Sequence, residues 1–203
     1  MFNTFLIPVD GSAPAKRAAK YGLELAVRYD ASVELLHVVK KGVLSDSTHR
    51  NKKKAQGKAI LEAAAELDIE GDPSIETHLV VGNPGKAITN HVADRDIDFV
   101  VMGRHGRSGV GEHLFGTVAE RVLRGSDAPV LTVPGDTVER ETGRTYENIL
   151  LTTDGSGVAE RAAPYGADIA KRTGATLHFL TVVDIKSEAG PFDAGGVSEE
   201  YIE

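Results

Sequence analysis

The residues best suited to chemistry in this 203-residue chain lie in one glycine-rich stretch between positions 103 and 118. Its glycines stand at positions 103, 106, 109, 111 and 116. Glycine has no side chain, so backbone N–H groups in such a loop can surround an anion closely. The stretch also offers positive charge and hydroxyl donors, from Arg104, His105, Arg107, Ser108 and Thr117. This chemistry suits a phosphate group.

The segments on either side of the loop fit the same chemistry. Residues 99–102 are an apolar run that predicts a buried strand. From Val118 onward the chain has helical periodicity, so the loop leads to a helix N-terminus, which favours negative charge. The alternative interpretation is a surface loop in which the glycines serve only the turn.

The spacing of the glycines favours the phosphate interpretation. Gly103, Gly106 and Gly116-Thr117 form the pattern G-x2-G-x9-G-[ST]. This pattern resembles the nucleotide-binding signature of the universal stress protein family, in which it follows the fourth strand and marks the members that bind ATP. It is neither a G-x-x-x-x-G-K-[ST] loop nor a G-x-G-x-x-G turn after the first strand, so an ordinary P-loop or dinucleotide fingerprint is not supported.

The elements that position this loop alternate along the chain. Apolar β-rich runs predict five strands, at residues 5–9, 33–39, 75–81, 97–102 and 129–133. Helical patterns predict four helices, at residues 13–29, 55–67 and 85–93 and after Gly116. This alternation predicts an α/β fold: an open five-stranded parallel sheet of order 3-2-1-4-5 with helices on both faces.

An open sheet of this order binds ligands beyond the carboxyl ends of the strands, where the strand order reverses. That point lies between the first and fourth strands. Asp10 follows the first strand and Gly103 ends the fourth, so two loops far apart in sequence are expected to face one crevice.

Several residues near these loops also have simple structural interpretations. Ser12, with Pro14 in the first turn, can cap the first helix, so Asp10-Gly11-Ser12 could be turn and cap chemistry alone. Asn83-Pro84 reads as a cap followed by a first-turn proline. The lysines at positions 52, 53 and 54 are interpreted as a solvated face, and the alternative is that they approach a nucleotide tail if the loop folds over it.

The family resemblance covers residues 1–134 and implies a set of contacts. Pro8 and Asp10 match first-strand contacts, and Val38 matches the residue beside adenine. Met102 and Gly103 match the exit of the fourth strand, with Arg104 and His105 at the rim of the loop. The phosphate-cradling positions are matched by Gly106, Gly116, Thr117 and Val118. The resemblance further implies ATP with Mg²⁺ or Mn²⁺ as the ligand, and a homodimer along the edge of the fifth strand, unless a docked second half forms a pseudo-dimer there.

The beginning of the chain is repeated after residue 145. Asp10-Gly11-Ser12 aligns with Asp154-Gly155-Ser156, and Tyr21-Gly22 aligns with Tyr165-Gly166. We therefore expect a nucleotide-binding domain at 1–135, a linker at 136–145 and an incomplete second copy at 146–203. The copy lacks strands three to five and the glycine loop, so no second nucleotide site is expected. An incomplete sheet would expose strand edges and an apolar face, which favours aggregation, pairing with another chain or docking on the first domain.

The composition limits the class of protein. The formal net charge of −7 disfavours a general nucleic-acid surface. The chain has no cysteine, no apolar stretch of membrane-spanning length and no leader-like start, so a soluble, cytoplasmic protein without a membrane partner is expected. The histidines at positions 37, 78, 91 and 178 have no metal-ligand spacing, so no metal site is expected.

Two classes of function remain open. A regulatory protein would use ATP occupancy to signal energy or stress status to an unidentified partner. A slow ATP hydrolase, or a phosphoryl or nucleotidyl transferase, would need an oriented nucleophile and charge stabilisation. The sequence offers Asp10 and several arginines but no separate base motif, so no catalytic residue is assigned and regulatory binding is favoured. An interaction module without a ligand is disfavoured by the intact glycine pattern.

Overall fold

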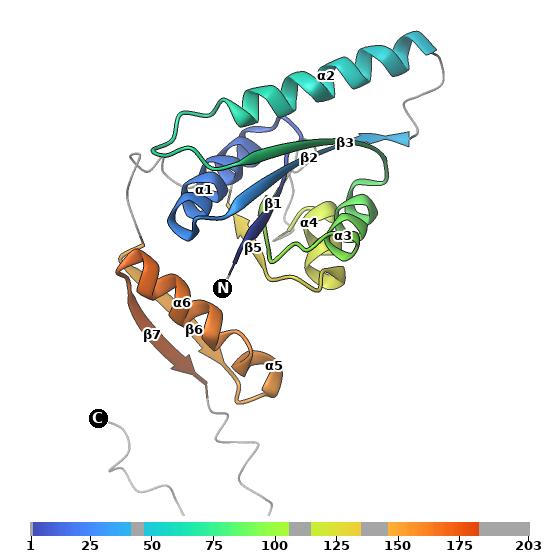
Figure 1. Cartoon of the computed structure of the whole chain (residues 1–203). Coiled ribbons are helices and arrows are strands. Elements are labelled where there is room, and N and C mark those ends of the chain that lie inside the picture. Colours follow the sequence, from blue (N-terminus) through green and yellow to red (C-terminus); the bar gives the residue numbers. More distant parts are fainter. Residues whose placement is uncertain (1, 42–46, 106–114, 135–145, 183–203) are drawn as a thin grey trace, which may run out of the picture. The chain divides into compact units, whose positions relative to one another are not determined.

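A computed structural model describes residues 2–41, 47–105, 115–134 and 146–182 of the chain (Figure 1). The chain divides into two compact units, Met1–Arg144 and Thr145–Glu203. In the part of the chain that the structure describes, no helix has both the length and the apolar character needed to cross a membrane.

The first unit is a parallel sheet covered by helices on both faces (Figure 1). Its strands pair in the order β3-β2-β1-β4-β5, and every pair is parallel, which confirms the predicted fold class and strand order. The strands are β1 (Thr4–Pro8), β2 (Ser32–Lys40), β3 (Ile75–Gly82), β4 (Phe99–Gly103) and β5 (Val130–Val133). The helices are α1 (Ala13–Tyr29), α2 (Ser47–Ala65), α3 (Pro84–Asp94) and α4 (Thr117–Gly125).

Alternate residues of the central strands pack against opposite helix layers. On one face, α1 approaches the sheet so closely that a Cβ on Gly22 would lie 2.5 Å from Ile7 Cδ1. On the other face, buried residues of β1, β2 and β4 join α3 and α4 in one apolar cluster that includes Leu6, Leu36, Ile88 and Val122. The central strands are therefore buried on both faces, which is why they read as continuous apolar runs.

Helix starts follow the predicted capping chemistry. Ser12 caps α1, its Oγ accepting the Ala15 N–H at 3.3 Å. Asn83 caps α3, its Oδ1 accepting the Lys86 N–H at 3.2 Å. The predicted start of α2 at residue 55 is wrong, because the helix already begins at Ser47. Its first half is polar and basic, and lysine, arginine and glutamine are good helix formers that leave no apolar periodicity to detect.

The second unit contains a two-stranded parallel sheet and two short helices. These are β6 (Asn148–Thr153), α5 (Gly157–Glu160), α6 (Ala163–Thr173) and β7 (Thr176–Thr181). The segment that aligns with α1 forms two helices, because Pro164 lies in the first turn of α6 and lacks the N–H that would continue α5. Leu150 and Phe179 are 61% and 65% exposed, so apolar side chains of this small sheet are uncovered. Residues 183–203 and the predicted linker at 136–145 lie outside the described residues.

Candidate functional site

A cavity of about 320 Å³ lies at the carboxyl ends of the central strands of the first unit. All but one of the residues predicted to contact a ligand line it: Pro8, Asp10, Val38, Met102, Gly103, Arg104, His105, Gly116, Thr117 and Val118. The exception, Gly106, lies outside the described residues, as do Arg107 and Ser108. The cavity is at the reversal point between β1 and β4, where the strand order places ligands in open α/β sheets.

The lining combines apolar and cationic groups. Leu36, Ile60, Ile88 and Met102 supply apolar surface from β2, α2, α3 and β4. Among the described lining residues, the cationic side chains are those of Lys40, Lys53 and Arg104, and Asp10 is the one carboxylate. In a chain whose net charge is −7, this is a local excess of positive charge. The cavity therefore suits a ligand with a flat or apolar part and an anionic part.

The residues of α2 that face the cavity correct one interpretation made from the sequence. Lys52 and Lys54 are exposed, as expected of a solvated face. Lys53 is partly buried and lines the cavity, so the solvated-face interpretation is wrong for this residue. Successive helix positions point about 100° apart, and the register of α2 turns only one of the three lysines toward the sheet.

Asp10 is held in a tight turn directly after β1. Its Oδ1 accepts the Ser12 N–H at 2.9 Å, and Gly11 between them has φ of 79°, a backbone conformation that favours glycine. The turn thus serves the start of α1 and also places the carboxylate on the cavity wall. The structural and the functional interpretations of Asp10-Gly11-Ser12 are compatible.

The start of α4 differs from those of α1 and α3. Gly116 is its N-cap residue, and no side chain of the described residues caps the helix. The Gly116 N–H donates to the Arg104 carbonyl at 2.9 Å, which joins the two ends of the glycine-rich loop. Gly116 therefore brings the backbone close to the cavity while its own N–H is engaged. The first-turn N–H groups of α4, beginning at Thr117 and Val118, have no intrahelical acceptor, and such groups can donate to an anion.

Gly103 has a second reason to be glycine. A Cβ at this position would lie 3.0 Å from the Pro14 carbonyl carbon and 3.2 Å from the Ala15 backbone nitrogen. The end of β4 therefore packs directly on the first turn of α1, and both Gly103 and Ala15 line the cavity. The loop pattern in the sequence identifies Gly103, but the neighbour across the fold is visible only in the structure.

His37 is a cavity residue that the sequence did not single out. Its buried imidazole donates from Nδ1 to the Val9 carbonyl at 2.7 Å. The Val9 N–H donates in turn to the Leu36 carbonyl at 2.9 Å. These bonds tie the segment after β1 to β2 on the wall beside Val38. A histidine within an apolar strand is the sequence signal, but its partner cannot be read from spacing.

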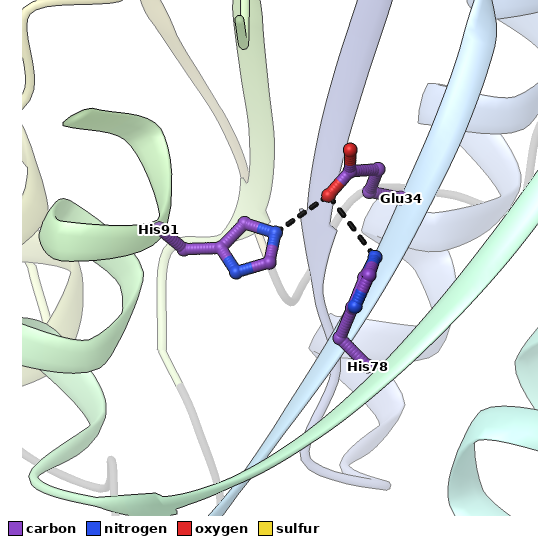
Figure 2. Close-up of side chains that lie close together, drawn as sticks. All are labelled: Glu34, His78 and His91. Carbon is purple, nitrogen blue, oxygen red and sulfur yellow. Dashed lines mark hydrogen bonds and ion pairs between the residues drawn. The ribbon is translucent and has the colours of Figure 1, made fainter. Parts of the chain in front are cut away.

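A second polar cluster lies where β2, β3 and α3 meet. His91 Nε2 lies 2.6 Å from Glu34 Oε2, and His78 Nε2 lies 3.1 Å from the same oxygen (Figure 2). Glu34 and the two histidines have side chains that are only 10–16% exposed. His78 lies in a predicted strand and His91 in a predicted helix, and no sequence spacing brings the two histidines together. A charged Glu34 inside an apolar strand was the available signal, because a buried charge needs partners.

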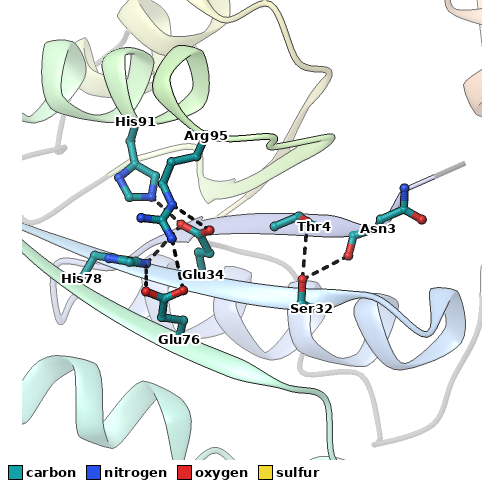
Figure 3. A network of polar contacts seen from close by, with 8 residues as sticks. All are labelled: Asn3, Thr4, Ser32, Glu34, Glu76, His78, His91 and Arg95. Atoms are coloured by element: carbon teal, nitrogen blue, oxygen red, sulfur yellow. Dashed lines mark hydrogen bonds and ion pairs between the residues drawn. The ribbon is translucent and has the colours of Figure 1, made fainter.

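Arg95 and Glu76 extend this cluster (Figure 3), and their side chains are 40% and 61% exposed. Arg95 Nε donates to Glu34 Oε1 at 2.9 Å, and its other end donates to Glu76 Oε2 at 3.2 Å. Burial raises the pKa of Glu34, but the hydrogen bonds from His91 and Arg95 outweigh it and hold that pKa below its ordinary value. Glu34 is therefore a carboxylate at neutral pH.

These features define an open parallel α/β protein with a ligand cavity at the reversal point of its sheet. The family model described as "Universal stress protein family" matches residues 1–134 and 145–201. The chain therefore belongs to the universal stress protein family. The second matched segment contains the repeat seen in the sequence.

Individual relatives support the same assignment. The chain is 33% identical over 147 residues to universal stress protein YxiE of Bacillus subtilis, covering 66% of this chain and 99% of that protein. A solved universal stress protein from Archaeoglobus fulgidus has a TM-score of 0.69 at 25% identity, covering 91% of this chain and 69% of its own. The structure of MJ0577 from Methanocaldococcus jannaschii has a TM-score of 0.53 at 26% identity, covering 70% and 99%.

Proposed function

We propose that the chain is a cytoplasmic regulatory protein that binds ATP, with Mg²⁺ or Mn²⁺, in the cavity between β1 and β4. The observation that carries this proposal is the start of α4. It has no side-chain cap from the described residues, it lines a cavity rich in cationic side chains, and it stands in the glycine pattern that resembles the family's ATP-binding signature. A helix start of this kind offers backbone N–H donors and a favourable dipole to a phosphate.

The two parts of the nucleotide have different environments in the proposal. The phosphates lie against the backbone of Thr117 and Val118, with Arg104 and His105 beside them. The adenine lies near Val38, against the apolar wall. Asp10 faces the ribose and phosphate side from the end of β1. The cavity volume of about 320 Å³ is within the range of roughly 300–1,000 Å³ usual for small-molecule sites.

Binding, not turnover, is the proposed activity. Efficient phosphoryl transfer needs a positioned base or nucleophile together with charge stabilisation. Asp10 is the carboxylate among the described cavity residues, and one of its oxygens is engaged by the Ser12 N–H. A slow hydrolase or transferase is the alternative. Turnover at ordinary enzyme rates that disappears in Asp10→Ala would replace the binding proposal with the enzymatic one.

Two further proposals concern the domain limits and the oligomeric state of the chain. We propose domain limits of 1–135 and 146–203 around a linker, with the second segment an incomplete tandem copy. We also propose that the protein forms a homodimer or pseudo-dimer along β5, which is an edge strand of the sheet with partly exposed residues. Light scattering of the purified chain tests the dimer, and a monomer at micromolar concentration would remove it.

The repeat supplies a matched control for the binding experiment. In the second unit, Asp154 Oδ1 accepts the Ser156 N–H at 2.9 Å, the same turn that Asp10 makes with Ser12. Calorimetric titration with ATP, ADP and AMP is expected to show one site, weakened about 10–100-fold by Asp10→Ala, the usual effect of removing a charged hydrogen-bond partner. Asp154→Ala is expected to bind like the unchanged chain. Absence of binding, or equal losses in both variants, would contradict the proposal.

A further inference from the structure

We propose that Glu34, His78 and His91 form a binding site for a divalent transition-metal ion of the zinc type. One ligand atom from each of the three side chains lies within 4.8 Å of the other two. Figure 2 shows both imidazoles directing a nitrogen toward the same carboxylate oxygen of Glu34. Two histidines and one glutamate are an established ligand set for zinc, which leaves a fourth position open.

Two of the three ligand-atom distances are close to the spacing that a metal needs, and the two imidazole nitrogens lie within 4.8 Å of each other. Zinc bonds to nitrogen and oxygen of about 2.0–2.2 Å place tetrahedral ligand atoms roughly 3.3 Å apart. His78 Nε2 and Glu34 Oε2 are 3.1 Å apart, and His91 Nε2 and Glu34 Oε2 are 2.6 Å apart. A small side-chain rotation at His91 lengthens the distance between its Nε2 and Glu34 Oε2. His91 then binds through Nε2 with its proton on Nδ1.

His78 gives an independent reason to expect a ligand. Its Nε2 is buried and, among the described residues, makes no hydrogen bond. The atom lies within ion-pair distance of Glu34 Oε2 and of Glu76 Oε1, at 3.1 and 3.3 Å, but it makes no hydrogen bond to either. A buried polar atom that makes no hydrogen bond costs free energy. A metal ion between His78 and Glu34 would satisfy it.

The charges of the surrounding side chains favour the binding of a cation. Glu34 and Glu76 carry two negative charges, and Arg95 supplies one positive charge to both of them. With both histidines neutral, the cluster keeps one net negative charge. Arg95 engages Glu34 Oε1 and leaves Oε2 to the histidines, the way outer hydrogen bonds orient a carboxylate ligand in metal sites. Glu76, whose side chain is 61% exposed, or a water can complete the coordination.

The competing occupant is a proton shared between the histidines and Glu34. Either a proton or a metal ion balances the negative charge of the cluster. Only a metal ion needs a lone pair from both imidazole nitrogens at once. A metal would also join α3 to β2 and β3. Since Ile88 of α3 lines the nucleotide cavity, the ion would stiffen one of the cavity walls.

The test uses the full chain, stripped of metal with a chelator and free of nucleotide. Titration with Zn²⁺ is expected to show one tight site per chain, Co²⁺ to give the visible spectrum of a tetrahedral complex, and Mg²⁺, which prefers oxygen ligands, not to compete. His78→Gln is expected to weaken Zn²⁺ binding at least about 100-fold, because changes even outside the ligand set cost 10–100-fold.

His178→Gln is the matched control, since it removes an exposed histidine of β7 that contacts Asn148. It is expected to bind Zn²⁺ like the unchanged chain. Melting of the metal-free variants shows whether each is folded, and His91→Gln replaces His78→Gln if the latter is not. The proposal is overturned if the unchanged chain takes up no Zn²⁺, or if a folded cluster variant binds it as tightly as the His178→Gln control.

Discussion

Gly103 offers a substitution whose effect can be worked out from the structure. It stands at the carboxyl end of β4, where a Cβ would lie 3.0 Å from the carbonyl carbon, 3.1 Å from the carbonyl oxygen of Pro14 and 3.2 Å from the Ala15 nitrogen. These are backbone atoms in the first turn of α1, which is held by the Ser12 cap, so they cannot rotate away as a flexible side chain would. In Gly103→Ala, α1 and β4 must move apart.

The magnitude follows from two opposing terms. Overpacking of a well-packed contact costs about 1–3 kcal/mol. Gly103 is not among the described glycines with positive φ, so alanine can adopt its backbone conformation. Alanine also lowers the conformational entropy of the unfolded chain, which stabilises the folded state by about 0.4–1 kcal/mol. Gly82→Ala is the matched control, because a Cβ there meets only Ala87 Cβ at 3.9 Å. The difference between the two variants isolates the steric term, about 1–3 kcal/mol.

Urea unfolding of the full chain, followed by circular dichroism, measures this difference. Gly103→Ala is expected to have the lower free energy of unfolding and also to bind ATP more weakly, since the displaced segments line the cavity. If Gly103→Ala is as stable as Gly82→Ala, the close approach of β4 to α1 is not a constraint and the reasoning fails.

Three other substitutions test separate features of the first unit. Ser12→Ala removes the cap on the Ala15 N–H and is expected to cost about 1 kcal/mol in urea unfolding; no loss would refute the cap. His37→Leu leaves the buried Val9 carbonyl without its donor and should cost about 1–3 kcal/mol, whereas unchanged stability would show that the bond contributes nothing. Burial raises the pKa of Glu24 above its ordinary value of 4.5. Ionisation of Glu24 therefore costs the folded state more than the unfolded state, so stability falls as the pH rises and the group loses its proton. Glu24→Gln should therefore gain stability relative to the unchanged chain between pH 4 and 7, and a pH-independent difference would contradict this.

The architecture of the first unit was predictable because each signal was local. Strands buried on both faces are continuous apolar runs, and Ser12 and Asn83 have the residue types that cap helices. The topological rule for open sheets then brought Asp10 and Gly103 to one place, although they are far apart in sequence. The family resemblance added the identities of the other residues predicted to contact the nucleotide.

The remaining features depended on contacts across the fold. The lysines of α2 are alike in sequence, and only the helix register turns Lys53 toward the cavity. Glu34, His78 and His91 come from three elements, so no spacing rule joins them. The register pairs Leu36 with His78 and Glu34 with Glu76, which puts these side chains on one face, but that register is not visible in a single sequence.

We propose above all that the start of α4 binds the phosphates of ATP while the end of β1 and the wall at Val38 hold the rest of the nucleotide. A crystal structure of the chain grown with ATP and Mg²⁺ tests it most directly. We expect phosphate oxygens within hydrogen-bond distance of the Thr117 and Val118 N–H groups, and adenine beside Val38. A nucleotide bound elsewhere on the chain, or one that reverses these two ends in the cavity, would contradict it.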